Sequence, residues 1–153
     1  MSFIIFLGLN LLAATSGAMF KPGDWYERLT KPSWQPPNWA FPAVWSVLYL
    51  LNAIAGWLIW EAAKGTDGVY LPIVVYVGSL ALNAAWSWLF FGRRNMRLAL
   101  VEAMALWVSI ALQIIVFYPI VPLAGLLLIP YLCWVSIAVF LNRTMLQLNP
   151  QYE

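Results

Sequence analysis

Five long apolar runs, separated by short polar stretches, make up most of the chain. They cover residues 3–20, 41–60, 69–91, 96–118 and 121–141. A helix needs roughly 20 mostly apolar residues to cross a bilayer core, and backbone polar groups in lipid must pair within the protein. Pro130 falls inside the fifth run and is expected to kink its helix. The pattern predicts an all-α membrane protein: a bundle of five transmembrane helices forming a single domain over residues 1–153.

The first run lacks the basic residues that open a secretory signal peptide. Met1 and Ser2 lead directly into it, and the first basic residue, Lys21, comes after it. We therefore expect this run to be retained as a transmembrane helix, with a cleaved signal as the alternative.

Basic residues are concentrated on one side of the predicted bundle. The connections after the first and third runs and the C-terminal tail hold Lys21, Arg28, Lys31, Arg93, Arg94, Arg97 and Arg143. Only Lys64 lies on the other side. Because cytoplasmic loops are enriched in lysine and arginine, we expect the N-terminus outside and the C-terminus in the cytoplasm.

The amino-acid composition limits which kinds of functional site the chain can form. Hydrophobic residues make up 63% of the chain and charged residues 9%, where soluble domains carry about a quarter charged. Histidine is absent, which excludes His-ligated haem, ordinary zinc sites and Ser-His-Asp triads. The single cysteine, Cys133, has no partner for an internal disulfide. A net charge of +2 without a basic run predicts no nucleic-acid binding, and we expect no metal site and no required cofactor.

Polar and aromatic residues recur at helical spacing within the runs. The five faces are Asn10, Ala14 and Gly17; Trp45, Tyr49 and Asn52; Tyr76, Ser79, Asn83, Trp86 and Phe90; Glu102, Ser109 and Gln113; and Tyr131, Trp134, Ala138 and Asn142. Such faces indicate either helix packing or a cavity within the bundle. Trp45 and Trp134 are less easily explained as membrane-interface residues, and an aromatic cavity of this kind suits a flat, mostly apolar ligand.

Glu102 is the only carboxylate well inside a run. A buried acid is costly in a membrane and is by default a functional-site hypothesis. The structural alternative is an ion pair with Arg97 or a hydrogen bond to an amide such as that of Asn83. One acid without a basic relay gives little support to a proton-coupled transporter.

The connection between the first two runs is long and rich in tryptophan and proline. Residues 21–42 read KPGDWYERLTKPSWQPPNWAFP. Its prolines exclude a regular helix just before the second run. A stiff aromatic loop at the mouth of a bundle is either a lid or an anchor in the headgroup region.

Four segments closely resemble the TspO family, which comprises tryptophan-rich sensory proteins and the mitochondrial translocator protein, or peripheral-type benzodiazepine receptor. They are WYERLTKPSWQPPNWAFPAVWSVLY (25–49), LALNAAWSWLFF (80–91), LALVEAMALW (98–107) and PYLCWVSIAVFLNRTMLQLN (130–149). The resemblance covers nearly the whole chain. It implies a five-helix bundle in a lipid bilayer, often a homodimer, with the first connection acting as a lid.

The resemblance also implies a ligand pocket inside the bundle, beneath the first connection. The matching residues are Tyr26, Trp34, Trp45, Asn83, Trp134 and Ala138, with Trp39, Tyr49, Trp86 and Leu141 nearby. The ligands implied are porphyrins of the protoporphyrin IX type, sterols and benzodiazepine-type drugs. The two tryptophans linked to light-dependent porphyrin degradation in some bacterial members match Trp45 and Trp134, which would be the catalytic residues if this chain shares that activity.

The function implied by the resemblance is a membrane tetrapyrrole-binding sensor or translocator that regulates porphyrin metabolism. The alternatives are a light- and oxygen-dependent porphyrin-degrading enzyme and a porphyrin or sterol transporter. The sterol motif of the animal proteins lacks its tyrosine here, since Arg143 stands in that place. We therefore do not expect high-affinity cholesterol binding.

A reporter fused to the C-terminus tests the predicted orientation. Because all but one of the basic residues lie on that side, we expect reporter activity characteristic of the cytoplasm. An extracytoplasmic signal from the same fusion would overturn the orientation.

Overall fold

The computed structural model describes residues 1–20 and 22–152, and within them it is helical and free of strands. Five segments of the described chain are long and apolar enough to cross a membrane. They are α1 (Ser2–Met19), α3 (Ala40–Ala63), α4 (Tyr70–Ser87) with the π-helical turn η2 (Trp88–Gly92), α5 (Met96–Phe117), and the pair α6 (Pro122–Leu127) and α7 (Ile129–Leu148). The short elements are α2 (Asp24–Glu27), η1 (Asp67–Val69) and η3 (Pro150–Tyr152). The predicted all-α fold with five spans is confirmed.

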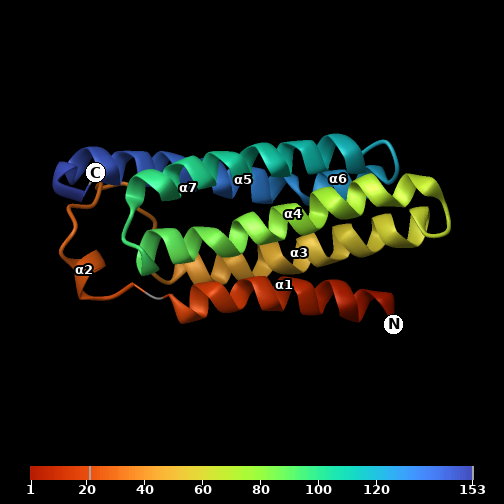
Figure 1. Ribbon diagram of the computed structural model, residues 1–153, viewed down its shortest axis with the longest axis horizontal. Coiled ribbons are helices and arrows are strands. Elements are labelled where there is room, and N and C mark those ends of the chain that lie inside the picture. The colour runs from red at the N-terminus through yellow and green to blue at the C-terminus, as the bar shows by residue number, and fades with distance from the viewer. Residues whose placement is uncertain (21, 153) are drawn as a thin grey trace.

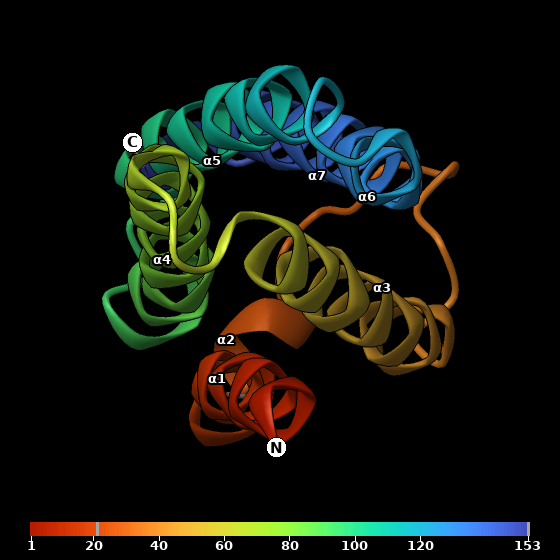
Figure 2. The same ribbon diagram turned by 90° about the vertical axis from the view of Figure 1, so that its right-hand side faces the viewer.

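The five spans lie side by side, roughly along the long axis of the molecule (Figure 1). α1 packs against α3 and α4, and α5 packs against α4 and α7. α6 contacts both α3 and α5, whereas α7 touches α3 at only a few positions (Figure 2). The first connection, the α4–α5 turn and the C-terminus share one end, which we call the loop end; the N-terminus lies at the opposite end.

The fifth span differs from its predicted form. Pro130 lies in the first turn of α7, and the helix is interrupted between Leu127 and Ile129, so the expected kink is a break. α7 then continues seven residues beyond the predicted end at residue 141, and Arg143 therefore lies within the helix. The hydropathy pattern marks where a helix leaves the lipid, but backbone hydrogen bonding carries the helix further.

Tight packing holds α1, α3 and α4 together. Gly56 of α3 lies under the ring of Tyr76, and a Cβ added to it would stand 2.6 Å from that ring and 2.8 Å from the ring of Phe6. The Phe6 and Tyr76 rings meet edge to face, with centroids 5.4 Å apart. A residue without a side chain is what allows three helices to meet here.

A buried network of amides extends this contact to α5. The Asn52 amide donates to Asn10 Oδ1 (2.9 Å), and the Gln113 amide donates to Asn52 Oδ1 (3.1 Å). The Asn10 amide in turn donates to the Tyr76 hydroxyl and to the Phe6 carbonyl. All these side chains are buried, and hydrogen bonds are favoured where no water competes. The network ties α1, α3, α4 and α5 together in the half of the bundle away from the loop end.

Substituting Gly56 with alanine tests this contact. The added methyl group has no room, so we expect a loss of about 1–3 kcal/mol of stability and a melting temperature several degrees lower in detergent. Gly78→Ala is the matched control, because a Cβ at Gly78 of α4 meets nothing within 4 Å. Equal melting temperatures for the two variants would contradict the packing.

Candidate ligand-binding site

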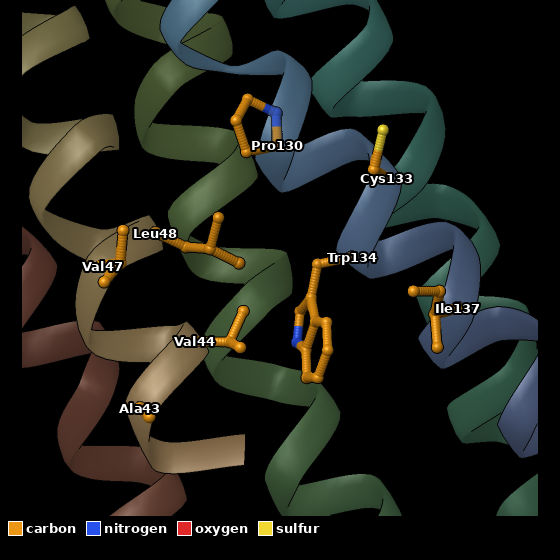
Figure 3. Close-up of a pocket in the computed structure, with 8 residues that line it drawn as sticks. All are labelled: Ala43, Val44, Val47, Leu48, Pro130, Cys133, Trp134 and Ile137. Carbon is orange, nitrogen blue, oxygen red and sulfur yellow. The ribbon is translucent and has the colours of Figure 1, made fainter. Parts of the chain in front are cut away.

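A groove opens where α3 and α7 separate. It has a volume of about 500 Å³. Its lining comes from α3 and α7 and consists of Ala43, Val44, Val47, Leu48, Pro130, Cys133, Trp134 and Ile137. Figure 3 shows the Trp134 indole projecting from α7 into the gap, with Val44 and Leu48 pointing toward it from α3. The lining is apolar and open on one side, which suits an apolar ligand.

Behind the residues that line this groove lies a layer of aromatic side chains, which we call the inner wall: Phe41, Trp45, Tyr49 and Tyr131. The Trp134 ring packs edge to face with Phe41, with centroids 5.7 Å apart. Deeper in the bundle, Trp45 contacts Tyr131 at 5.9 Å and Tyr49 at 5.5 Å. A chain of ring contacts therefore joins α3 and α7 behind the groove.

Hydrogen bonds fix the two tyrosines of the inner wall. The Tyr49 hydroxyl donates to Asn83 Oδ1 (2.6 Å), and the Asn83 amide donates to the Tyr131 hydroxyl (2.7 Å). Asn83 belongs to α4, so one amide joins α3 to α7 across the bundle. These are the polar groups that orient the aromatic wall.

A second aromatic cluster lies beneath the first connection. Tyr26 of α2 packs edge to face on Phe91 (5.5 Å) and Phe90 (6.3 Å), and Trp86 stacks on Phe90 (5.0 Å). Leu141 of α7 is buried in the same cluster. Both phenylalanines belong to η2, where the Arg93 amide donates to the Trp88 carbonyl (2.7 Å), a step of five residues. This wider π-helical turn presents consecutive rings to Tyr26.

The first connection is fastened across the loop end by Asn149. The Thr30 amide donates to Asn149 Oδ1, and the Asn149 amide donates to the Thr30 carbonyl, both at 2.9 Å. Tyr26 and Leu29 are buried against the bundle. Burial raises the pKa of the Tyr26 hydroxyl, so the hydroxyl is neutral when it packs here.

The same connection also presents two tryptophans outward. Trp34 is 49% exposed and Trp39 is 73% exposed. The sequence left two roles open for this connection, a lid and an anchor in the headgroup region. Tyr26 and Leu29 cover the bundle as a lid would, and the exposed position of Trp34 and Trp39 suits contact with headgroups.

The ten residues predicted for the ligand site fall into three groups. Trp134 lines the groove, with Ala138 one turn further along α7, and Trp45, Tyr49 and Asn83 lie in or support the inner wall behind it. Tyr26, Trp86 and Leu141 lie in the cluster beneath the connection, and Trp34 and Trp39 are exposed. Sequence reasoning missed Phe41, Val44, Cys133 and Ile137, because apolar residues in a transmembrane run give no sign of which face lines a groove. Asn149 was missed because it follows the last predicted span.

Neither structural partner suggested for Glu102 is found. Both carboxyl oxygens are buried without a hydrogen-bond partner among the described residues. Asn83 is occupied by Tyr49 and Tyr131, and Arg97 is exposed and makes no ion pair in the described part of the chain. The structural alternative for Glu102, an ion pair with Arg97 or a hydrogen bond to an amide, is therefore wrong.

These features define a multi-pass helical membrane protein with an apolar groove, containing Trp134, between two of its spans. The model of the TspO/MBR family matches residues 3–148. The chain is 41% identical over 147 residues to a tryptophan-rich protein TspO of Chlorobaculum tepidum, covering 94% of this chain and 93% of that protein. It is 34% identical over 148 residues to protein CrtK of Rhodobacter capsulatus (97% and 92%) and 39% identical over 130 residues to the translocator protein of Homo sapiens (82% and 77%). The chain belongs to the TspO/MBR family.

Replacing Asn149 with alanine tests how the first connection is fastened. The variant loses both bonds to Thr30, so we expect the connection to detach more often and trypsin to cleave after Arg28 about tenfold faster. Asn38→Ala, at an exposed position of the same connection, is the control and should cleave at the wild-type rate. Unchanged cleavage in Asn149→Ala would show that Asn149 does not hold the connection.

Proposed function

We propose that this protein is a membrane receptor for porphyrins, which bind in the groove between α3 and α7. The observation that carries the proposal is the groove itself. It has a volume of about 500 Å³, and its apolar lining includes the Trp134 indole. Ligand pockets usually span roughly 300–1,000 Å³ and combine aromatic walls with a few polar groups. Tyr49, Asn83 and Tyr131 supply such groups behind the wall.

Ring contacts rather than metal coordination account for the affinity. The chain has no histidine, the usual axial ligand of a metalloporphyrin. Trp134 in the groove and Trp45 behind it offer indole faces to a flat macrocycle. Aromatic pairs of this kind contribute beyond the area that they bury, so a metal-free porphyrin is a suitable ligand. Benzodiazepine-type drugs, which are also flat and apolar, would use the same groove.

The direction in which the groove opens supports recruitment from the bilayer. It opens sideways between two spans, whereas the first connection is fastened across the loop end. A lipid-soluble ligand therefore reaches Trp134 without release of the connection. Relatives named tryptophan-rich sensory protein, in Cereibacter sphaeroides, and translocator protein, in several mammals, support a role in sensing or carrying such a ligand.

Removing the indole from the groove tests the proposal. We expect Trp134→Ala to raise the dissociation constant for protoporphyrin IX about tenfold or more, because it removes both stacking and buried apolar area. The measurement is an absorbance titration of the porphyrin with protein in nanodiscs.

Trp57→Ala is the matched control for this experiment. Trp57 packs against Phe3 and lies twelve residues from Trp45 on the same helix, about 18 Å along its axis. This variant should bind as the wild type does. Equal affinities of Trp134→Ala and wild type would remove the groove from consideration.

A further inference from the structure

Glu102 stands in an unusual environment for an acid. The residue is 7% exposed, and neither oxygen of its carboxyl group has a hydrogen-bond partner among the described residues. The nearby amides are already used: Asn83 bonds two tyrosines, and the Asn142 amide group lies against the Met96 carbonyl and the Leu100 N–H. An acid kept in such a place without a partner is costly, and the cost points to a partner from outside the chain.

The Trp86 side chain contains a second buried polar group without a hydrogen-bond partner among the described residues. Its ring stacks on Phe90, but its indole N–H is buried without an acceptor in the described part of the chain. An indole N–H only donates hydrogen bonds. The bundle therefore holds an unused donor on α4 and an unused carboxyl group on α5.

The helix register brings these two groups to the same level. α4 and α5 are adjacent and antiparallel, and the Ser109 hydroxyl donates to the Ser79 hydroxyl (3.2 Å) between them. Trp86 follows Ser79 by seven residues, and Glu102 precedes Ser109 by seven. Seven residues are close to two full helical turns, so Trp86 and Glu102 return to the two facing sides of α4 and α5.

Tyr131 connects this pair to the groove. Glu102 interacts electrostatically with Tyr131, and the Tyr131 ring contacts Trp45 on the inner wall. Asn83, which donates to the Tyr131 hydroxyl, lies one turn before Trp86 on α4. Tyr131 and Asn83 therefore place Trp86 and Glu102 behind the aromatic residues next to the groove.

We propose that Trp86 and Glu102 form a polar subsite that receives a carboxylic acid group on the edge of the ligand. This inference rests on the proposed function for the apolar part of the ligand. The carbonyl oxygen of the acid accepts from the Trp86 N–H, and its hydroxyl donates to a Glu102 oxygen. One proton shared between two carboxyl groups makes a strong hydrogen bond, and both unused groups gain a partner. The subsite distinguishes acid-bearing porphyrins from porphyrins that are apolar all round.

Protoporphyrin IX and its dimethyl ester test the subsite, because the ester still accepts hydrogen bonds but no longer donates one. We expect wild-type protein in nanodiscs to bind the free acid about tenfold more tightly than the ester. Glu102→Leu should bind the two with equal affinity. Glu102→Gln should keep the preference, because its amide oxygen still accepts the hydrogen bond.

The stability of the ligand-free protein separates a binding role from a structural one. Glu102→Leu removes a buried acid without a partner, so it should melt no lower than wild type. Gln113→Leu is the contrast: it breaks the bond to Asn52 and should melt lower while keeping the preference for the free acid. A lower melting temperature for Glu102→Leu would assign Glu102 a structural partner and overturn the subsite.

The outcomes also separate this inference from the proposed function. If wild-type protein binds neither porphyrin, the proposed function itself fails. If it binds both equally, or if Glu102→Leu still prefers the free acid, the groove binds porphyrin and the subsite is wrong. In that case, the two buried groups are bridged by water only.

Discussion

The bundle depends on the buried amide network that joins Asn10, Asn52 and Gln113. In lipid, burying apolar surface gives little drive for helices to associate, so packing and interhelical hydrogen bonds set the geometry. The network and the close contact at Gly56 hold four helices together in the half away from the loop end. That half is closed by its own side chains. The remaining half is where α3 and α7 part, and a groove exists there because the fold is secured elsewhere.

The loop end is held by a different principle. There, aromatic rings pack from the first connection onto η2 and the end of α4, and Leu141 and Met145 of α7 complete the cluster. Ring contacts tolerate small displacements better than bonds of fixed direction do. The molecule thus combines a rigid polar half with an adaptable aromatic half, and the groove lies where the two meet.

The fold could be predicted from the sequence because each span carries its own signal. Length and hydropathy fix a transmembrane helix within the run itself, and all five spans agree with the runs that were predicted. The end of α7 and the break before Pro130 could not be fixed in this way, because both depend on backbone geometry beyond the hydropathy pattern. The resemblance pointed to Trp45 of α3 and Trp134 of α7; Trp134 lines the groove, and Trp45 contacts Tyr131 behind it.

Other parts of the site depend on contacts between distant segments. Nothing local to Asn149 marks it as the residue that holds Thr30, 119 positions away. The structural alternative that paired Glu102 with Asn83 is not found, because the Asn83 side chain is bonded to Tyr49 and Tyr131 on other helices. The bond between Asn149 and Thr30 has a further consequence. The Asn149 side chain hydrogen-bonds only to the backbone N–H and C=O of residue 30, much as a neighbouring β-strand would. The side chain at residue 30 can therefore vary in evolution while the connection stays attached. Proline is the exception, because it has no backbone N–H to donate.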